Sequence, residues 1–224
     1  MALTVCLALT IPFVLLSPAT AMARYFAHWG ARLLRVLCFM PLQLRGLEHL
    51  PARPHLLVVN HASYLDALLL TAALPPKPGY AYVVKQELAE LPLVGRMLTR
   101  IGMLYIDRRN PNKGLSQVYA MARHLADGSN LVVFPEGTFK ADPNLQPFRM
   151  GGFAAAARAG VPVQVAAVLG TREALPDGEW RPRPRVLALH VGSLHVPTGE
   201  GWDAAEQLCQ AAHAEMLRLL QHTA

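Results

Sequence analysis

The spacing of apolar and polar positions predicts a chain in which strands and helices alternate. Short apolar runs bounded by turn residues predict buried strands at residues 42–45, 55–59, 80–84, 102–106, 131–134, 161–168 and 185–191. Apolar positions at helical spacing predict helices at residues 63–73, 110–128, 149–160 and 202–221. This alternation is typical of an α/β fold, and we expect a mixed central sheet flanked by helices.

The N-terminal region has a different pattern. No charged side chain occurs from Met1 to Ala23, which is close to the roughly 20 apolar residues that cross a bilayer core. Pro12 and Pro18 make one straight span less regular. A secretory signal peptide is the alternative, because Ala21-Met22-Ala23 resembles a cleavage site, but no Lys or Arg precedes the apolar stretch. We therefore expect a membrane element that is retained.

The next segment predicts an amphipathic helix. Arg24, His28, Arg32 and Arg35 share one helical face, and the rest of the surface is aromatic or aliphatic. This pattern fits a helix lying in the headgroup region of a membrane, with its basic side on the cytoplasmic face. The alternative is an ordinary amphipathic helix packed on the domain. We expect residues 1–41 to form membrane-associated helices and residues 42–224 to form a catalytic domain.

Composition and charge narrow the choice of partner. The chain is 53% hydrophobic and carries a formal net charge of +6, which favours a membrane surface or a phosphate-bearing partner. Nucleic acid is not expected, because the arginines are scattered and no recognition motif accompanies them. Cys6, Cys38 and Cys209 are far apart and form no CxxC pair, so neither a disulfide framework nor a zinc site is expected.

A candidate catalytic pair follows the predicted strand at residues 55–59. The run Asn60-His61-Ala62-Ser63-Tyr64-Leu65-Asp66 places a histidine at a strand end and a carboxylate about one helical turn beyond it. Such a pair can act as a general base with its orienting acid. Ser63-x-x-Asp66 also matches a capping box that opens a helix. The two interpretations are compatible, because a cap would hold Asp66 near His61.

Two further candidates follow later strands. Arg108 ends the run Tyr105-Ile106-Asp107-Arg108 and suits recognition of a phosphate, although a surface pairing with Asp107 is the alternative. Phe134-Pro135-Glu136-Gly137-Thr138 places a carboxylate, a glycine and a hydroxyl on one turn. Gly137 would let backbone N–H groups approach an anion or a glycerol oxygen. A plain tight turn with a solvated Glu136 is the alternative there.

Four blocks in this order carry a family resemblance. They are His61-x4-Asp66, Gly102-x-x-Tyr105-Ile106-Asp107-Arg108, Phe134-Pro135-Glu136-Gly137-Thr138 and Val161-Pro162-Val163. Together they resemble the glycerolipid acyltransferase family, whose members include 1-acylglycerol-3-phosphate acyltransferases. A stretch beginning at Lys85 resembles one found between the first two blocks in that family. The resemblance covers roughly residues 42–195.

The resemblance implies a mechanism and a set of site residues. His61 would take the proton from a glycerol hydroxyl, which attacks the thioester of acyl-CoA or an acyl-carrier protein, and Asp66 would hold the imidazole. The acceptor would be a lysophospholipid, best 1-acyl-sn-glycerol-3-phosphate, giving phosphatidate. The resemblance assigns the acceptor to Arg108, Glu136, Gly137 and Thr138, with Lys85 as a further phosphate partner. It implies no metal and no cofactor, and a protein that works on membrane lipids at the cytoplasmic face of the inner membrane.

One departure keeps the acceptor open. The family commonly has a basic residue directly after the glutamate–glycine–threonine run, whereas this chain has Phe139 followed by Lys140. Lys140 or Arg149 would then substitute, or the acceptor would be another lysolipid, such as a lyso-aminolipid or lysophosphatidylglycerol. A membrane lipid-binding protein without catalysis is the alternative from another class.

Overall fold

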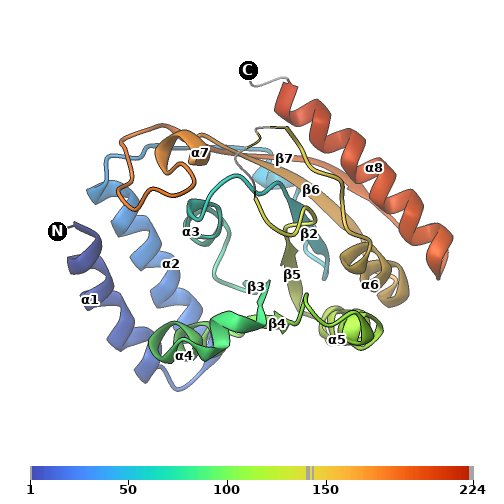
Figure 1. Ribbon diagram of the computed structural model, residues 1–224, viewed down its shortest axis with the longest axis horizontal. Helices are drawn as coiled ribbons and strands as arrows, with labels where there is room; N and C mark the ends of the chain where they lie inside the picture. Colours follow the sequence, from blue (N-terminus) through green and yellow to red (C-terminus); the bar gives the residue numbers. More distant parts are fainter. Residues whose placement is uncertain (1, 140–141, 143, 222–224) are drawn as a thin grey trace.

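The predicted mixed sheet is present. The structure is a computed structural model that describes residues 2–139, 142 and 144–221. The described residues form a sheet in the order β1-β7-β6-β2-β5-β3-β4 (Figure 1). All neighbouring pairs are parallel except β6 and β7, which are antiparallel. The strands are β1 (Leu42–Arg45), β2 (Leu56–Val59), β3 (Tyr80–Lys85), β4 (Leu104–Ile106), β5 (Asn130–Val133), β6 (Val163–Leu169) and β7 (Leu187–His195).

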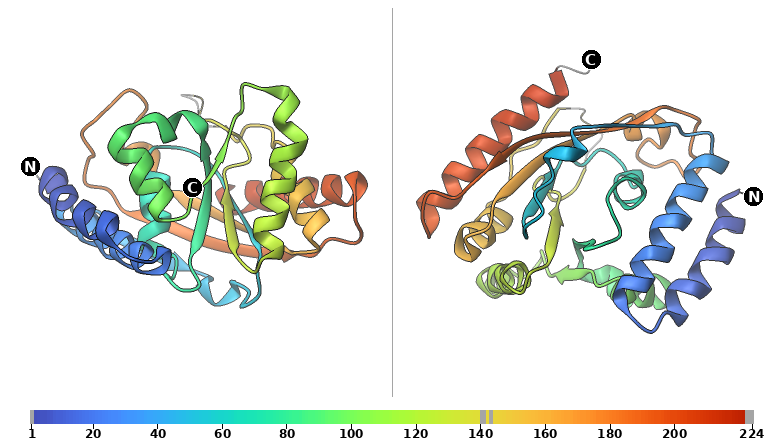
Figure 2. Two further views of the ribbon diagram at one scale, coloured as in Figure 1. Left: turned by 90° about the horizontal axis from the view of Figure 1, so that it is seen from below. Right: turned by 180° about the vertical axis from the view of Figure 1, so that it is seen from behind.

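Helices cover both faces of this sheet. On one face α5, α6 and α8 pack side by side, and on the other α2 packs on α3 while α1 contacts α2 and α4 (Figure 2). Because both faces are covered, the central strand β2 is buried along its whole length, which explains its unbroken apolar run. The helices are α1 (Ala2–Leu16), α2 (Thr20–Leu37), α3 (Leu65–Ala73), α4 (Pro92–Arg100), α5 (Gly114–Ala126), α6 (Gly151–Ala159), α7 (Thr171–Ala174) and α8 (Trp202–Gln221).

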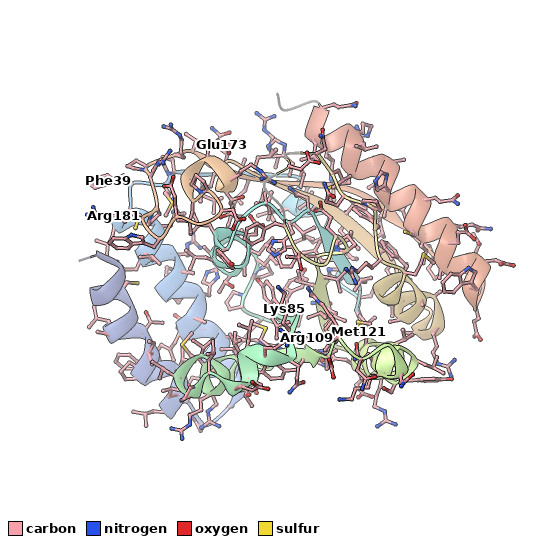
Figure 3. The ribbon with its side chains drawn as sticks, in the orientation of Figure 1. Phe39, Lys85, Arg109, Met121, Glu173 and Arg181 are labelled. Carbon is pink, nitrogen blue, oxygen red and sulfur yellow. The ribbon has the colours of Figure 1, made fainter. Side chains whose placement is uncertain are left out.

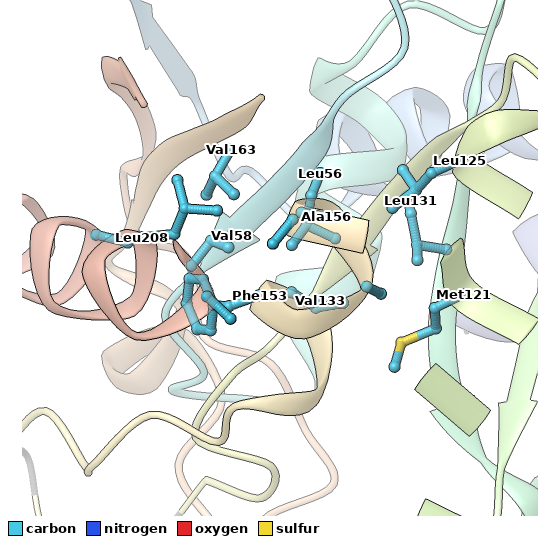
Figure 4. Close-up of a cluster of buried hydrophobic side chains, with 14 of the residues drawn as sticks. Leu56, Val58, Met121, Leu125, Leu131, Val133, Phe153, Ala156, Val163 and Leu208 are labelled. Carbon is cyan, nitrogen blue, oxygen red and sulfur yellow. The ribbon is translucent and has the colours of Figure 1, made fainter. Parts of the chain in front are cut away.

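The core on the α5–α6–α8 face is drawn in Figure 4. Leu56 and Val58 point to that face, while Leu57 and Val59 belong to the core on the other face. Phe153 on α6 is fully buried against this cluster. Burying a side chain of this size stabilises the fold by about 1.5–3 kcal/mol. The two cores therefore hold β2 in place from both sides.

The connections place a crevice at the carboxyl ends of β2 and β5. The chain leaves β2 through α3 to reach β3 on one side of the sheet, and it leaves β5 through α6 to reach β6 on the other side. β2 and β5 are neighbours, so the loops that follow them diverge to opposite faces. In open α/β sheets, ligands bind in the crevice at such a topological switch point. The predicted pair His61 and Asp66 follows β2.

The N-terminal apolar stretch is divided between the two helices of a hairpin, and the break falls at Pro18, one of the two prolines that make a straight span less regular. Helix α1 ends at Leu16 and α2 begins at Thr20. Pro18 lies in the break, where its missing N–H and fixed φ disfavour a continuous helix. No helix within the described part of the chain is long and apolar enough to cross a membrane.

Two members of the basic stripe of α2, Arg24 and His28, face the rest of the molecule, while Arg32 is exposed. Arg24 Nε donates to the carbonyl oxygen of Ile101 at 2.9 Å. His28 is buried, with Nδ1 2.9 Å from the carbonyl oxygen of Thr71, and burial lowers its pKa. The exposed face of α2 is otherwise aromatic and aliphatic: Met22, Tyr25, Trp29, Leu33, Val36 and Leu37. The packing of α2 on α3 thus agrees with the alternative interpretation of this helix.

Most predicted elements lie within a few residues of the observed ones. The predicted helix 149–160 begins at Gly151, and the last strand extends to His195. The short helix α7 and the 3-10 turns Leu47–His49, Gln86–Glu90 and Pro111–Lys113 were not predicted. The division at residue 41 stays a prediction.

Candidate active site

His61 and Asp66 form a direct pair. The imidazole Nδ1 lies 2.8 Å from Asp66 Oδ2, and Asp66 is completely buried. The same oxygen accepts the backbone N–H groups of Ala62 at 2.7 Å and Ser63 at 2.9 Å. Because Oδ2 acts as an acceptor toward all three groups, Nδ1 carries the imidazole proton and Nε2 is left with a free lone pair. One carboxylate therefore both holds the turn that precedes α3 and fixes the tautomer that a general base needs.

Aromatic rings fix the position of the His61 ring. Phe134 stacks on the imidazole with ring centroids 4.3 Å apart. Phe139 meets its edge at 4.8 Å, and Tyr64 in turn meets Phe139 at 4.8 Å. The side chain of His61 is only 19% exposed. These contacts limit the rotation of the ring and reduce the access of water to it.

Glu136 holds the turn after β5 against the end of β2. Its Oε1 accepts the backbone N–H of His61 at 2.6 Å, and its Oε2 accepts the backbone N–H of Gln146 at 2.9 Å. The residue is buried, so the alternative of a solvated Glu136 is wrong. Both carboxylate oxygens are engaged within the protein. Glu136 thus links the candidate base to the loop that carries Gly137 and Thr138.

A basic cleft of about 240 Å³ lies beside the Phe134–Gly137 turn and α5. Arg108 and Arg149 both line it, and Arg108 Nη1 donates to the carbonyl oxygen of Gly137. Burial and the nearby charge of Arg149 lower the pKa of Arg108. Asp107 binds Lys113 Nζ at 3.0 Å, so the alternative in which Arg108 pairs with Asp107 does not hold. The cleft offers two guanidinium groups to an anion.

Gly137 is required by the geometry of this cleft. Its φ of +84° is a left-handed conformation that side chains disfavour. A Cβ atom at this position would lie 2.5 Å from Arg149 Nε. The glycine therefore permits both the turn and the close approach of Arg149.

An apolar pocket of about 250 Å³ lies on the other side of Phe134. It is lined by side chains of α1, α2, α3, α4 and β3, including Ala27, Leu34, Leu68 and Met103. Phe134 lines both this pocket and the basic cleft. Since Phe134 also stacks on His61, both cavities are bounded by the ring that covers the candidate base.

Two predicted acceptor residues, Thr138 and Lys85, do not line the basic cleft. Thr138 is exposed. Lys85 is exposed at the end of β3, near Arg109 and outside the lining of the basic cleft (Figure 3). Lys140 lies outside the described residues. Their assignment to the acceptor stays a prediction.

Sequence reasoning missed some contributors to the site. Gln146 acts through its backbone N–H, so its side-chain type gives no signal. In the sequence, Phe134 is marked only by its place before the Pro135–Thr138 run. Its position against His61 could not be predicted, because it depends on the pairing of β2 with β5. Within the described part of the chain, no group of three or more His, Cys, Asp or Glu side chains is placed to hold a metal ion.

Comparison with known proteins gives the family. Residues 41–168 match the model of the Acyltransferase family, and this match covers more than half of the chain. The chain therefore belongs to the acyltransferase family, and its class is that of enzymes of lipid biosynthesis.

Its relatives act on two kinds of lysolipid. A lyso-ornithine lipid O-acyltransferase of Pseudomonas aeruginosa is 32% identical over 205 residues, covering 85% of this chain and 76% of the relative. A 1-acyl-sn-glycerol-3-phosphate acyltransferase of the same organism is 30% identical over 190 residues, covering 84% and 71%. A chloroplastic 1-acyl-sn-glycerol-3-phosphate acyltransferase of Brassica napus is 31% identical over 75% of this chain, which spans 48% of that relative.

The fold has a match among solved structures. The crystal structure of the 1-acyl-sn-glycerophosphate acyltransferase PlsC from Thermotoga maritima superposes with a TM-score of 0.78. It covers 96% of this chain and 87% of the other, at 22% identity. The likeness shows that the two chains share a fold.

Proposed function

We propose that this protein transfers a fatty acyl chain from a thioester to the free hydroxyl of 1-acyl-sn-glycerol-3-phosphate, giving phosphatidate. The observation that carries the proposal is the His61–Asp66 pair beside Phe134, which stacks on His61 and lines both the basic cleft and the apolar pocket. The acceptor phosphate would bind in the first, and the acyl chain that is transferred would bind in the second. The named relatives that use this acceptor support the proposal.

The reaction needs one proton to move in two steps. His61 Nε2 takes the proton of the acceptor hydroxyl as its oxygen attacks the thioester carbonyl. A carbon–oxygen bond forms, the carbon–sulfur bond breaks, and the imidazolium returns the proton to the leaving thiolate. Asp66 keeps Nδ1 protonated and stabilises the imidazolium while it exists. General base catalysis of this kind contributes about 10²- to 10⁴-fold to a rate.

The acceptor phosphate would bind in the basic cleft. Arg108 and Arg149 supply the charge there. The turn at Gly137 brings its backbone close to both arginines. Arg108 is already oriented by its bond to the Gly137 carbonyl, so little side-chain freedom remains to be lost on binding. Lys85, Thr138 and Lys140 are further candidates for the headgroup.

The acyl chain would bind in the apolar pocket under the helical hairpin. The outer face of the same hairpin exposes Tyr25, Trp29 and Leu33, which suit the boundary between lipid headgroups and chains. We propose that the hairpin lies on a membrane, at the cytoplasmic face of the inner membrane. The lipid acceptor could then pass from the membrane to His61 without crossing water.

A lyso-aminolipid is the second candidate acceptor. Phe139, where the family commonly has a cation, is buried against His61 and Tyr64. The site therefore has one positive charge fewer beside the base than the family pattern supplies. The relative that acts on a lyso-ornithine lipid is as similar to this chain as those that act on lysophosphatidate.

A panel of acceptors and donors tests the proposal. Purified protein is given acyl-CoA and acyl-carrier protein with lysophosphatidate, a lyso-ornithine lipid and lysophosphatidylglycerol, and product is measured. We expect the highest kcat/KM with lysophosphatidate, and a fall of about 10²- to 10⁴-fold in His61→Ala. His49→Ala is the matched control, because His49 is exposed and away from the site. Full activity in His61→Ala would refute the mechanism. Absence of turnover with every pair would favour a lipid-binding protein.

A further inference from the structure

A third cavity lies against His61 on the side away from Arg108. It has a volume of about 160 Å³ and lies at the carboxyl ends of β2 and β6. Its lining includes His61, Glu136, Leu169, Thr171, Glu173 and Leu220. It shares no lining residue with the basic cleft or the apolar pocket. Figure 3 labels Glu173 on α7; Lys85 ends β3, which is separated from β6 by β2 and β5 in the sheet.

Of the buried polar side chains that line this cavity, Asn60 and Glu136 are paired and, among the described residues, Thr171 is not. Asn60 exchanges two hydrogen bonds with the backbone of Val168, at 3.0 and 2.7 Å, and both oxygens of Glu136 accept backbone N–H groups. Thr171 is fully buried, and its hydroxyl has no hydrogen-bond partner in the part of the chain that the structure describes. A buried hydroxyl without a partner is destabilising, and its place in the cavity lining makes it a candidate partner for a ligand atom.

Three groups meet at the carbon under attack, and the two cavities assigned so far account for only two of them. The carbon under attack is bonded to the acyl chain, the incoming acceptor oxygen and the sulfur of the donor. The apolar pocket suits the acyl chain, and the basic cleft suits the acceptor phosphate. The sulfur carries an arm that must also reach His61, because the carbon–sulfur bond breaks beside the base. Of the three cavities, the third is the one whose lining includes His61.

We propose that the third cavity, the donor cleft, binds the pantetheine arm of the acyl donor. This proposal rests on the proposed acyl-transfer function. The arm is uncharged and carries amides and a hydroxyl, and CoA and acyl-carrier proteins share it. It matches a cavity in which both oxygens of the buried carboxylate, Glu136, already accept hydrogen bonds, and in which Arg172 and Glu173 carry opposite charges. An amide of the arm would supply the partner that the Thr171 hydroxyl lacks.

A substitution at the mouth of the donor cleft tests this assignment without disturbing the core. Glu173 is exposed, so Glu173→Trp can fold and narrow the entrance, and Asp177→Trp on the following loop is the matched control. We expect the KM for acyl-pantetheine to rise about tenfold in Glu173→Trp, equivalent to 1.4 kcal/mol. The KM for the lysolipid and for an acyl thioester of ethanethiol, which has no arm, should be unchanged. Equal losses with the two donors would overturn the proposal.

A binding measurement separates this proposal from the proposed reaction. The probe is an S-alkyl pantetheine thioether, which cannot transfer its chain, and binding is followed by calorimetry. We expect Thr171→Val to weaken binding about fivefold through loss of one hydrogen bond and to leave the affinity for an S-alkyl ethanethiol thioether unchanged. Thr171→Ser, which keeps the hydroxyl, should bind like the wild type. If the pantetheine probe bound no better than the ethanethiol probe, the donor cleft would be refuted, even in a protein that transfers acyl groups normally.

Discussion

The basic cleft and the apolar pocket meet at Phe134 but are built in different ways. The cleft is made by loops at the carboxyl ends of strands, where Arg108 and Gly137 are fixed by backbone contacts. The pocket is made by side chains of four helices and one strand. In the proposed reaction the acceptor phosphate would thus bind at the rigid sheet, whereas binding of the acyl chain would depend on the packing of the N-terminal hairpin. This difference teaches that the acceptor headgroup and the transferred acyl chain can be recognised by separate layers of the molecule.

The separation predicts that each cavity can be altered alone. A change in the cleft should affect the acceptor headgroup without changing acyl-chain preference. A change in the pocket should do the reverse. A change at a residue that positions His61 should lower the rate and leave both preferences unchanged.

Among the changes within the two cavities, Arg108→Ala is expected to have the largest effect. Loss of charged hydrogen bonds to the phosphate removes about 1.5–3 kcal/mol of binding, so the KM for lysophosphatidate should rise about 10- to 150-fold. Neutral acceptors and acyl-chain preference should be unaffected in steady-state assays. Arg109→Ala is the matched control, because Arg109 is 82% exposed and bound to Glu87 at 2.8 Å. An equal loss with neutral acceptors would show that Arg108 has no phosphate role.

Ala27→Phe is expected to change chain-length preference. Ala27 lines the apolar pocket, and a phenyl ring there would exclude the end of a long acyl chain. Each excluded methylene removes about 0.8 kcal/mol, so kcat/KM for long chains should fall about fourfold per methylene relative to short chains. Competition assays with donors of mixed chain length measure this ratio.

The control for that change is Ala21→Phe, on an exposed part of the same helix. It should leave the ratio of products unchanged. If Ala27→Phe lowered activity equally for all chain lengths, the pocket would not hold the acyl chain.

Glu136→Gln is expected to have the smallest effect, and on the rate alone. The amide can accept one N–H bond but not both, so His61 loses part of its support. Loss of one hydrogen bond of about 1 kcal/mol should lower kcat about fivefold, with the acceptor KM unchanged. Glu200→Gln, at an exposed loop residue, controls for loss of charge. A rise in the acceptor KM with kcat unchanged would instead identify Glu136 as an acceptor ligand.

The parts of the molecule that could be predicted from the sequence depend on local patterns. The buried run of β2 follows from its continuous apolar residues, and the His61–Asp66 pair follows from a spacing of five residues across one helix start. The order of the four family blocks along the chain indicates the acyltransferase family, which the His61–Asp66 spacing alone does not indicate. Both features can be predicted because the residues that form each of them are close in sequence.

The parts that could not be predicted depend on contacts between distant segments. Periodicity places Arg24 in the basic stripe of an amphipathic helix, but its hydrogen-bond partner, the carbonyl group of Ile101, is 77 residues away. Glu136 reads as solvated or ligand-binding, but it meets His61 across 75 residues. The break near Pro18 turns one apparent span into a hairpin that closes the apolar pocket. Periodicity shows which residues share a face, but not which neighbour covers that face.

The central claim is that Asp66 acts through His61, and a double-mutant cycle tests it directly. Single-turnover transfer rates are measured for the wild type, His61→Ala, Asp66→Asn and the double variant. Thermal unfolding is followed in parallel, because Asp66 also accepts N–H groups of Ala62 and Ser63. We predict that both single variants lose about 10²-fold or more and that the double variant is no slower than His61→Ala. If the two losses multiplied in folded proteins, the two residues would act independently and the account would be wrong.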